Sequence, residues 1–505
     1  MGISNGVKQP FIPHHLDDII VFGKHTILVC LLSELALLSQ LSNTMYMVYA
    51  GATPVIKGCG NVTFTSMNDA CDNLNLCEGI PLDLDSQFYS INEEWDLYCN
   101  KRYLERRSTS FQMLGVMIGS LTFGEIGSSF GRKKPLLFCL LMSGLLSLVA
   151  GFVNDLVQFS IIRFMLGVFT GGHSTIVVVY MLENVPIKSR MWINTAISYS
   201  PNVIVLGIMA YFFQHWRSLT LVVAALHIPA VALMLYLNES PRWLVQKGKI
   251  REARQVILDI ARMDGKKTKI NETTLDLLLQ REHDRFEIMG KARNTYRHVF
   301  QKRGLAFPLF VISFSFFCGV MINYGNMFNL NALSGSIYLN SILIGSLRYS
   351  TNLFCGFLDY KFTCFGRKTA HTACQMLILG LLILSTSMIV SGNQTSYGEL
   401  TRYCVLIICA LASQVVIVDS VTCNEFFPTS VRTRCYSFVQ LWCRLGIVLA
   451  PYLYSWNELW PYLSYTFLIV VTIMNTILYE VVLSETKNKP LEDHIVKRSR
   501  NTTEV

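Results

Sequence analysis

Six charged residues lie within long apolar stretches of the sequence. They are Glu34, Arg163, Arg348, Asp419, Glu425 and Arg444. A charge at the centre of a bilayer costs roughly 2.5–3.5 kcal/mol on insertion scales, so charged residues in such stretches usually recognise ions, control gating or form buried ion pairs. A guanidinium group in a low-dielectric cavity can bind a carboxylate through two parallel hydrogen bonds. The chemistry that these residues could perform is therefore recognition of an organic ion.

Arg444 gives the sharpest hypothesis. We predict that its guanidinium binds a substrate carboxylate; the alternative is a permanent structural ion pair with Asp419 or Glu34. If both acids instead face a cavity without partners, a cation or a zwitterion would fit better. Aromatic residues could contact a quaternary ammonium through cation–π interactions, although packing between helices is the alternative for any single one. The predicted substrate-binding residues are Arg444, Tyr324, Asp419, Glu34 and Trp442.

Apolar runs long enough to cross a membrane must position these residues. Charged residues make up only 15% of the chain, against about 25% in soluble domains, and a helical span needs about 20 apolar residues. Runs of this kind cover 26–46, 108–127, 135–153, 158–182, 191–213, 218–237, 305–326, 334–358, 369–391, 400–421, 433–455 and 461–483. The runs at 108–127 and 334–358 are the weakest, because polar residues interrupt them. Continuous rather than alternating runs favour helices over a β-barrel, so we predict an all-α membrane protein.

A polar, Lys- and Arg-rich segment at 238–304 separates two hydrophobic blocks. We predict membrane bundles at 26–237 and 305–483, joined by this segment in the cytoplasm. The excess of Lys and Arg on one side then places the terminal segments, 1–25 and 484–505, in the cytoplasm as well. The net charge is +9, and the basic residues lie in short clusters between apolar runs. They do not form the basic face with interspersed aromatic residues that nucleic-acid binding would need. The expected partner is thus the lipid bilayer, in a multi-pass protein of the plasma membrane, and not a nucleic acid.

Two polar segments carry further signals. The stretch Lys249–Met263 has apolar residues at the spacing of an amphipathic helix, which predicts a cytoplasmic cap under the bundles; the alternative is a flexible linker. The segment 47–107, predicted outside, contains Asn61-Val-Thr, an N-glycosylation pattern. It also contains four cysteines, which indicate two disulfides with three possible pairings. They are Cys59, Cys71, Cys77 and Cys99.

Several motifs together resemble one family. In chain order they are EEWDLYC, GSLTFGEIGSSFGRKK, MLENVPIKSR, ESPRWL, NEFFPTSVRTR, CRLGIVLAPYL and SETKNKPLEDHI. This series is similar to the organic ion transporters of the major facilitator superfamily, which carry organic cations, carnitine and organic anions. The resemblance implies twelve transmembrane helices in two pseudo-symmetric six-helix halves. It also implies a substrate site between the halves and alternating access without a bound cofactor.

The resemblance also implies a gating machinery. The turn Phe-Gly-Arg-Lys occurs at 130–133 and again at 365–368, and the glycine permits a tight turn. The family normally has an acidic residue just before this turn, where Ser128 and Thr363 stand here; this departure puts the usual gating in doubt. The gating residues implied by the resemblance are Gly131, Arg132, Lys133, Arg163, Glu183, Gly366, Arg367, Lys368, Glu425 and Arg432.

The position of Arg444 separates branches of this family, since cation carriers resemble an Asp there and anion or carnitine carriers an Arg. Arg348 stands where the family often has Glu. We therefore expect a secondary transporter of organic anions or carnitine-like zwitterions. The alternatives are an organic cation transporter, a receptor or scaffold that lost transport, and a sugar carrier.

The absence of enzyme motifs and the last three residues of the chain give two further expectations. No hydrolase elbow, zinc-protease or phosphate-loop motif occurs, so we expect neither an enzyme nor a metal site. The final residues Thr503–Val505 match a pattern that PDZ domains accept.

Overall fold

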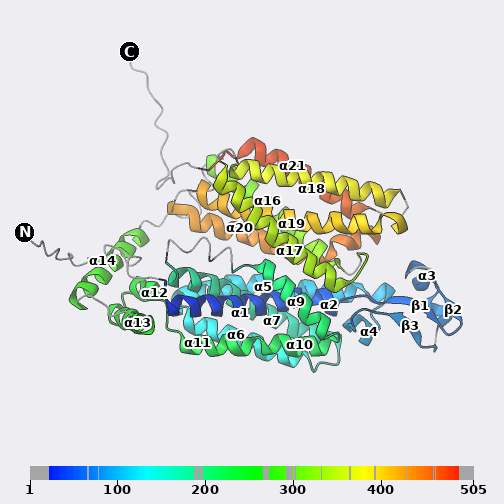
Figure 1. Cartoon of the computed structure of the whole chain (residues 1–505), viewed down its shortest axis with the longest axis horizontal. Coiled ribbons are helices and arrows are strands. Elements are labelled where there is room, and N and C mark those ends of the chain that lie inside the picture. Colours follow the sequence, from blue (N-terminus) through cyan, green and yellow to red (C-terminus); the bar gives the residue numbers. More distant parts are fainter. Residues whose placement is uncertain are drawn as a thin grey trace, which may run out of the picture.

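The computed structural model describes residues 22–487, except 65–66, 78, 187–192, 194–196, 266–271, 292–299, 301–302, 331–332, 363–364, 392–393, 428, 459 and 461. Two helical layers lie side by side, as Figure 1 shows. The predicted residues Thr363 and Thr503–Val505 lie outside the described part of the chain.

The first layer is the N-terminal half. It contains α1 (Lys24–Met45), α2 (Met47–Ala50), α5 (Tyr103–Phe130), α6 (Lys133–Ala150), α7 (Leu156–Asn184), α9 (Tyr199–Phe212), α10 (Trp216–Ala225) and α11 (His227–Tyr236). α1 with α2 and α10 with α11 each form one continuous membrane-length segment, Lys24–Ala50 and Trp216–Tyr236.

The second layer is the C-terminal half. It contains α16 (Arg303–Phe328), α17 (Ile337–Lys361), α18 (Arg367–Val390), α19 (Gln394–Phe426), α20 (Thr429–Leu449), the 3-10 helix η5 (Ala450–Glu458) and α21 (Leu463–Val482). Every apolar run expected from the sequence overlaps a helix of one of the two layers, which confirms the helical membrane fold.

Nine helices of the described residues are long and apolar enough to cross a membrane. α5, one of the two weakest sequence expectations, is among them, whereas α17, the other, is not. α20 also falls outside this set, and α9 is apolar but shorter. The polar helices α17 and α20 carry Arg348 and Arg444, respectively. A lower hydropathy is therefore found in two helices that bring arginine into the bundle.

A disulfide-bonded subdomain projects from one end of the layers, hereafter the disulfide end (Figure 1). It holds a small antiparallel sheet in the order β2-β1-β3, which the helical sequence pattern did not predict. Its elements are β1 (Val55–Cys59), β2 (Val62–Thr63), α3 (Met67–Asp72), η2 (Leu74–Cys77), β3 (Leu82–Asp85), α4 (Ile91–Glu94) and η3 (Cys99–Lys101). Disulfides join Cys59 to Cys77 and Cys71 to Cys99, one of the three pairings that the sequence left open.

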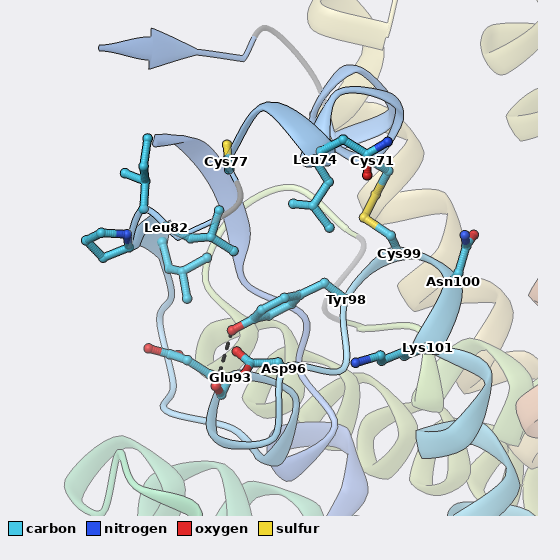
Figure 2. A pocket seen from close by; sticks show the side chains of 14 residues that line it. Cys71, Leu74, Cys77, Leu82, Glu93, Asp96, Tyr98, Cys99, Asn100 and Lys101 are labelled. Carbon is cyan, nitrogen blue, oxygen red and sulfur yellow. Dashed lines mark hydrogen bonds between the residues drawn. A yellow bond between two sulfur atoms is a disulfide. The ribbon is translucent and has the colours of Figure 1, made fainter. Parts of the chain in front are cut away.

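The subdomain contains a hollow of about 650 Å³, shown in Figure 2. Tyr98 lies at its centre and its hydroxyl donates a hydrogen bond of 3.2 Å to the carbonyl of Glu93. The lining comes entirely from the segment 71–101. Because no residue of α17 or α20 reaches it, this hollow is separate from the arginines, and we assign it no substrate.

Three helices of the central segment lie at the opposite end, hereafter the linker end (Figure 1). They are α12 (Pro241–Gln246), α13 (Ile250–Met263) and α14 (Glu272–Lys291). The amphipathic helix expected at Lys249–Met263 is present as α13, with Ala253 and Ile257 buried. These two side chains share an apolar cluster with Leu275 and Leu279 of α14, so the segment is a packed cap in its described part.

The two halves meet closely at the disulfide end. Gln87 of the subdomain donates a hydrogen bond to the Gly335 carbonyl (3.2 Å) and accepts one from the Ile337 backbone (2.9 Å). Tyr338 donates to the Gln87 carbonyl and stacks on Tyr49 of α2, with ring centroids 6.1 Å apart. At this end the N-terminal and C-terminal halves are therefore closed against each other.

Candidate functional site

Two arginines and two tyrosines from four helices converge between the halves. Arg444 (α20) interacts electrostatically with Tyr324 (α16) and with Tyr199 (α9), and Arg348 (α17) interacts with the same two tyrosines. These four residues are called the arginine group below. α9 belongs to the N-terminal half and the other helices to the C-terminal half, so the group spans the interface at which the resemblance places a substrate.

No carboxylate among the described residues is paired with either guanidinium. Arg348 is only 8% exposed, and its Nη1 contacts the sulfur of Met327 at 3.2 Å. Its Nε has no hydrogen-bond partner in the part of the chain that the structure describes. Arg444 is partly buried. Because burying an unpaired charge is expensive, the arginine group is suited to receive an anion.

The structure gives the predicted acids partners of their own. Asp419 (α19) is fully buried and accepts a 2.5 Å hydrogen bond from Ser315 (α16). Glu34 (α1) interacts with Asn202 (α9), and one of its carboxylate oxygens has no hydrogen-bond partner within the described ranges. Neither acid pairs with Arg444, so the alternative of a permanent ion pair at Arg444 is wrong. Asp419 lies inside the C-terminal half, apart from the arginine group.

Of the predicted aromatic residues, only Tyr324 lies in the arginine group. Trp442 (α20) packs edge-on against Phe310 and Phe317 of α16, with both centroid distances 6.3 Å. This is the packing role that the sequence left open as the alternative. Arg348 and Tyr199 are missing from the five predicted substrate-binding residues, although the sequence offered Arg348 as an intramembrane charge and Tyr199 as an aromatic residue that could line the cavity.

At the linker end, a carboxylate holds the turn of the N-terminal half. Glu239 accepts hydrogen bonds from the backbone N–H of Arg132 (2.8 Å) and of Lys133 (3.1 Å). These N–H groups belong to the first turn of α6, where no intrahelical acceptor exists and negative charge is favoured. The Arg132 side chain pairs with Glu183 of α7 at 2.9 Å, so α6, α7 and the start of the central segment are joined.

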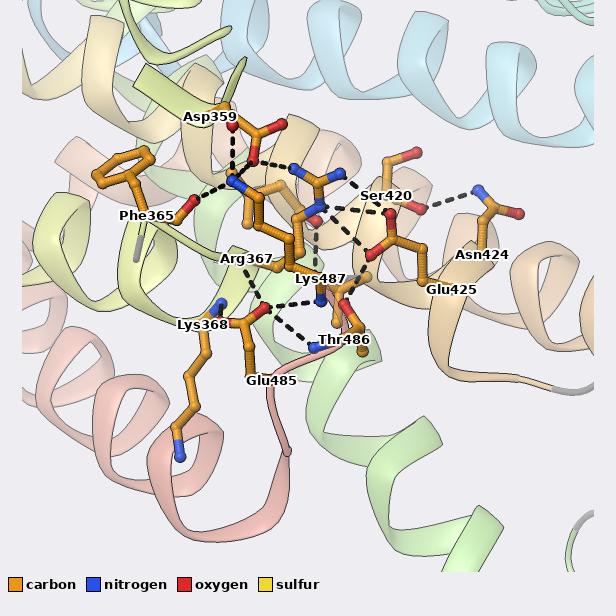
Figure 3. Close-up of polar contacts among 12 residues, drawn as sticks. Asp359, Phe365, Arg367, Lys368, Ser420, Asn424, Glu425, Glu485, Thr486 and Lys487 are labelled. Atoms are coloured by element: carbon orange, nitrogen blue, oxygen red, sulfur yellow. Dashed lines mark hydrogen bonds and ion pairs between the residues drawn. The ribbon is translucent and has the colours of Figure 1, made fainter. Parts of the chain in front are cut away.

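The C-terminal half repeats this arrangement, as Figure 3 shows. Glu485 accepts from the backbone N–H of Arg367 (2.8 Å) and of Lys368 (3.1 Å). The Arg367 side chain pairs with Glu425 of α19 at 3.1 Å and with Asp359 of α17 at 2.6 Å. Predicted gating residues therefore meet in equivalent networks, one in each half.

Glu239, Glu485 and Asp359 are parts of these networks that sequence reasoning missed. Glu239 begins ESPRWL and Glu485 belongs to SETKNK, both motifs already noted for the resemblance. Each follows the last helix of its half, so a comparison of the two halves could have identified them as an equivalent pair.

The glycine of each turn makes room for this carboxylate. A Cβ at Gly131 or Gly366 would collide with the carboxylate of Glu239 or Glu485, respectively. Only Gly131 has a left-handed backbone, with φ of +106°, whereas φ of Gly366 is −89°. The sequence interpretation of a tight turn therefore applies to Gly131 alone.

The remaining predicted residues have varied surroundings. Arg163 is 2% exposed and donates to the Asn43 carbonyl (2.8 Å) and to Gln112 (2.5 Å) inside the N-terminal half. Arg432 lies in α20, and its side chain is outside the described part. Asn61 is exposed on the turn between β1 and β2.

The chain is similar to known transporter proteins over most of its length. The family model "Sugar (and other) transporter" matches residues 48–495. Among relatives, an organic cation transporter protein of Drosophila melanogaster is 26% identical, and the alignment covers 83% of this chain and 76% of the relative. Organic anion transporter 3 of Oryctolagus cuniculus is 26% identical, and the alignment covers 80% of this chain and 73% of the relative.

The fold is also that of solved structures. The inward-open xylose transporter XylE from E. coli aligns with a TM-score of 0.65 at 15% identity, covering 92% of this chain and 98% of that one. Another structure of XylE, described as a proton:xylose symporter of the major facilitator superfamily, aligns with a TM-score of 0.63 at 16% identity, covering 93% and 98%.

Proposed function

Since the chain belongs to the sugar (and other) transporter family, we propose that it moves small organic anions or carnitine-like zwitterions across the membrane. The observation that carries this proposal is the arginine group. Two guanidiniums that have no acidic partner among the residues the structure describes lie beside two tyrosines at the interface of the halves. A carboxylate of the substrate would supply the missing negative charge, and the tyrosine rings would accommodate its organic part or a quaternary ammonium.

An organic cation is the second candidate. It is favoured by the Drosophila relative named an organic cation transporter protein. It is also favoured by Glu34, one of whose oxygens has no hydrogen-bond partner in the described part of the chain. Glu34 would then provide the negative charge for the substrate. The anion is preferred because two arginines outnumber this single carboxylate.

Alternating access would operate through the linker-end networks. In this structure the disulfide end is closed by Gln87 and Tyr338. The described contacts of Arg132 and of Arg367 stay within their own halves. Opening and closing at the linker end would thus move each half with its own network intact. The absence of an acidic residue at Ser128 does not remove the network, because Glu239 and Glu183 hold the turn.

The orientation is part of the proposal. We place the linker end and both termini in the cytoplasm of a plasma-membrane protein, with the disulfide end outside. Two disulfides suit an oxidising compartment. The exposed Asn61 is accessible for glycosylation there. A shift in electrophoretic mobility on glycosidase treatment, lost in Asn61→Gln, would support this orientation.

A PDZ-domain partner at Thr503–Val505 is a separate proposal from the sequence. Recovery of the full chain on an immobilised PDZ domain should be lost when Val505 is deleted. Equal recovery of both chains would reject it.

The transport experiment uses the full chain in proteoliposomes. Uptake of an aromatic monocarboxylate, carnitine and a quaternary ammonium is measured at two membrane potentials, with wild type, Arg444→Ala, Arg348→Ala and Arg444→Lys. Loss of about 3 kcal/mol of charge-assisted hydrogen bonding corresponds to roughly a hundredfold weaker binding. We therefore expect both alanine variants to lose carboxylate uptake, and Arg444→Lys to keep a fraction of it.

Arg262→Ala is the matched control, because Arg262 of α13 is 79% exposed and lies outside the arginine group. Uptake of the quaternary ammonium alone, unchanged in Arg444→Ala, would overturn the anion proposal. Binding of a carboxylate without flux would favour the receptor or scaffold.

A further inference from the structure

A cluster of polar side chains is buried inside the C-terminal half, away from the arginine group. Asp419 (α19) and His371 (α18) are both fully buried. Ser315 (α16) lies between them, 2.5 Å from Asp419 Oδ2 and 3.0 Å from His371 Nε2. Asn475 (α21) donates a hydrogen bond of 3.2 Å to the Ser315 hydroxyl. Four helices thus meet at an acid, a base and a hydroxyl that connects them.

The hydroxyl of Ser315 has one proton, and this restricts the possible hydrogen-bond patterns. If Asp419 is ionised, Ser315 donates to Asp419 Oδ2, and His371 Nε2–H must donate to Ser315. If Asp419 carries a proton on Oδ2, that proton is donated to Ser315, and Ser315 in turn donates to His371 Nε2. In the second pattern the ring proton of His371 is on Nδ1 instead of Nε2. The cluster therefore gains one proton in total when Asp419 is protonated and His371 changes tautomer, and both patterns fit the same heavy-atom positions.

Hydrogen-bonding capacity remains unused in the cluster. His371 Nδ1 and Asn475 Oδ1 have no hydrogen-bond partner among the described residues. Asp419 Oδ1 lies 3.6 Å from His371 Nε2, and the Tyr479 hydroxyl, which donates to Thr422 at 3.0 Å, is the other group that interacts with this carboxyl group. A purely structural polar network in a membrane interior is normally satisfied, since each unpaired group costs free energy. This cluster therefore has the features of a site that changes its protonation.

The surroundings provide no permanent cation for the carboxylate. The titratable side chains that act on Asp419 or on its immediate neighbours, from all the elements packed around it, are His371, Cys318, Cys423, Cys435, Tyr479 and Glu485. No Lys or Arg among the described residues is one of them. The Tyr479 ring stacks on the His371 ring with centroids 3.5 Å apart. A proton is hence the charge available to neutralise Asp419.

The cluster shares its helices with the linker-end network of the C-terminal half. Asp419 precedes Glu425 on α19, and His371 follows Arg367 by about one helical turn on α18. On α21, Tyr479 adjoins Glu480, which pairs with Lys368 at 2.9 Å. A change of charge at the cluster would thus act on the three helices that carry the linker-end network of the C-terminal half.

We propose that the Asp419–His371 cluster is a proton-binding site that couples transport to a proton gradient; this rests on the proposed anion transport. A proton from the outer solution forms an O–H bond with Asp419 while the substrate anion occupies the arginine group. The two cross together, and the O–H bond breaks on the inner side to release the proton to water. One proton and one monovalent anion carry no net charge, so the membrane potential, about 2.3 kcal/mol per charge at 100 mV, does not oppose uptake.

A sodium ion is the competing occupant and an outcome of the test. Hard cations prefer a shell of oxygen ligands, whereas here an imidazole nitrogen occupies one side of the carboxylate. Proteoliposomes containing the full chain are given an inward proton gradient or an inward sodium gradient, with the potential clamped, and carboxylate uptake and internal acidification are recorded. Wild type should respond to the proton gradient with both signals. A response to sodium alone would overturn the proposal.

Asp419→Asn mimics the protonated acid and should retain substrate counterflow within about twofold while losing gradient-driven uptake about tenfold or more. His371→Gln should shift the pH at which uptake is half-maximal. His227 of α11 is also buried, and His227→Gln is the matched control that should leave this pH unchanged. Asp419→Asn with undiminished gradient-driven uptake and acidification would overturn the proposal.

An infrared measurement separates this proposal from the proposed function. The pH-difference spectrum of wild type should contain the band of a protonated carboxylic acid that Asp419→Asn lacks. If no carboxylate is transported in any assay but this band is present, the transport proposal fails and the proton site stands. If the spectra of the two proteins are identical, the proton site fails. Asp419→Glu retains a carboxylic acid and should keep the band. This variant replaces Asp419→Asn in the comparison if the Asn variant is not monodisperse.

Discussion

Gly131 and Gly366 occupy equivalent places before α6 and α18, yet their backbones differ. Gly131 has φ of +106°, a region that side chains rarely adopt, and Gly366 has φ of −89°, which any residue adopts. Their common requirement is space, because a Cβ at either position would collide with the carboxylate of Glu239 or Glu485. At the residue scale, glycine is therefore needed for the position of an acid that is distant in sequence.

Alanine substitutions should distinguish these two requirements. Gly366→Ala and Glu485→Ala should each destabilise the protein, by about 1.5–3 kcal/mol for each charged hydrogen bond lost. The double variant should be little worse than either single one, because both remove the same contact. Gly131→Ala should be the more damaging glycine change, since backbone strain of about 1–3 kcal/mol is added. Thermal unfolding in detergent measures all four; strictly additive effects at Gly366 and Glu485 would contradict the shared contact.

A second residue-scale prediction concerns pH. Glu94 of α4 pairs with Arg217 of α10 at 2.5 Å. Burial acts to raise the pKa of Glu94, but hydrogen bonds from Arg217 and Trp216 outweigh burial and hold that pKa below its ordinary value. The pair therefore stabilises the fold fully above the unfolded-state pKa of about 4.3. This stability is lost as the pH falls through the lower folded-state pKa.

Glu94→Gln should accordingly have a lower unfolding temperature than wild type at neutral pH. The difference should shrink as the solution is acidified below about pH 4.3. Thermal unfolding over a pH series measures it. Lys249→Gln, which removes an exposed pair with Glu252 on α13, is the control and should change little at any pH. A gap between Glu94→Gln and wild type that is constant down to the lowest pH would contradict the assignment.

At the element scale, the sheet and short helices of the disulfide end have little apolar interior. Ile56, Ala70 and Tyr98 form its buried centre, and two disulfides join segments separated by 18 and 28 residues. A core this small rarely stabilises a subdomain alone, so cross-links usually supply the remainder. The disulfides thus hold Gln87 and Glu94 in positions from which they contact the helices.

Removal of one disulfide should loosen this subdomain selectively. Cys71→Ser with Cys99→Ser should lose about 3 kcal/mol of stability, as expected for closing a loop of this size. Proteolysis should then cut within 51–102 faster than in the helical layers. Cys30→Ser changes a free cysteine of α1 and should leave the cleavage pattern as in wild type. Uniform acceleration of cleavage throughout the chain would argue against a locally stabilised subdomain.

At the scale of the whole molecule, the closed disulfide end defines the conformation. Gln87 joins the halves through the Gly335 carbonyl, the Ile337 backbone and the Tyr338 hydroxyl. The side-chain amide of Gln87 both donates to and accepts from the C-terminal half, so it is suited to make and break these contacts during each cycle. We infer that Gln87 contributes to the equilibrium between closed and open arrangements at this end.

Gln87→Ala should shift this equilibrium toward opening at the disulfide end, because loss of about 1.4 kcal/mol changes the ratio of states about tenfold. Spin labels at Phe152→Cys and Val390→Cys, exposed positions at the disulfide ends of the halves, report the separation. Longer distances should gain population in Gln87→Ala. Asn73→Ala removes an amide that donates to Asp69 within the subdomain and should not alter the distances. An unchanged distribution in Gln87→Ala would refute this role.

The amino-acid sequence alone determined the membrane-spanning helices, the amphipathic helix α13 and the repeated Gly-Arg-Lys turns. These features depend on local hydropathy, periodicity and short motifs, which the chain carries at each position. The sequence also indicated that arginine at 444 favours an anion, but it could not tell whether an acid neutralises that arginine.

Only the tertiary structure decided which charged residues meet. Asp419 lies with His371 and Ser315, whereas Arg348 joins Arg444, and Glu485 reaches the turn before α18. A helix rotates its side chains by about 100° per residue, so the face that each charge occupies depends on how the helices pack. The partner of a buried charge is a long-range property, and for this reason the candidate site emerged from the packing of the two halves.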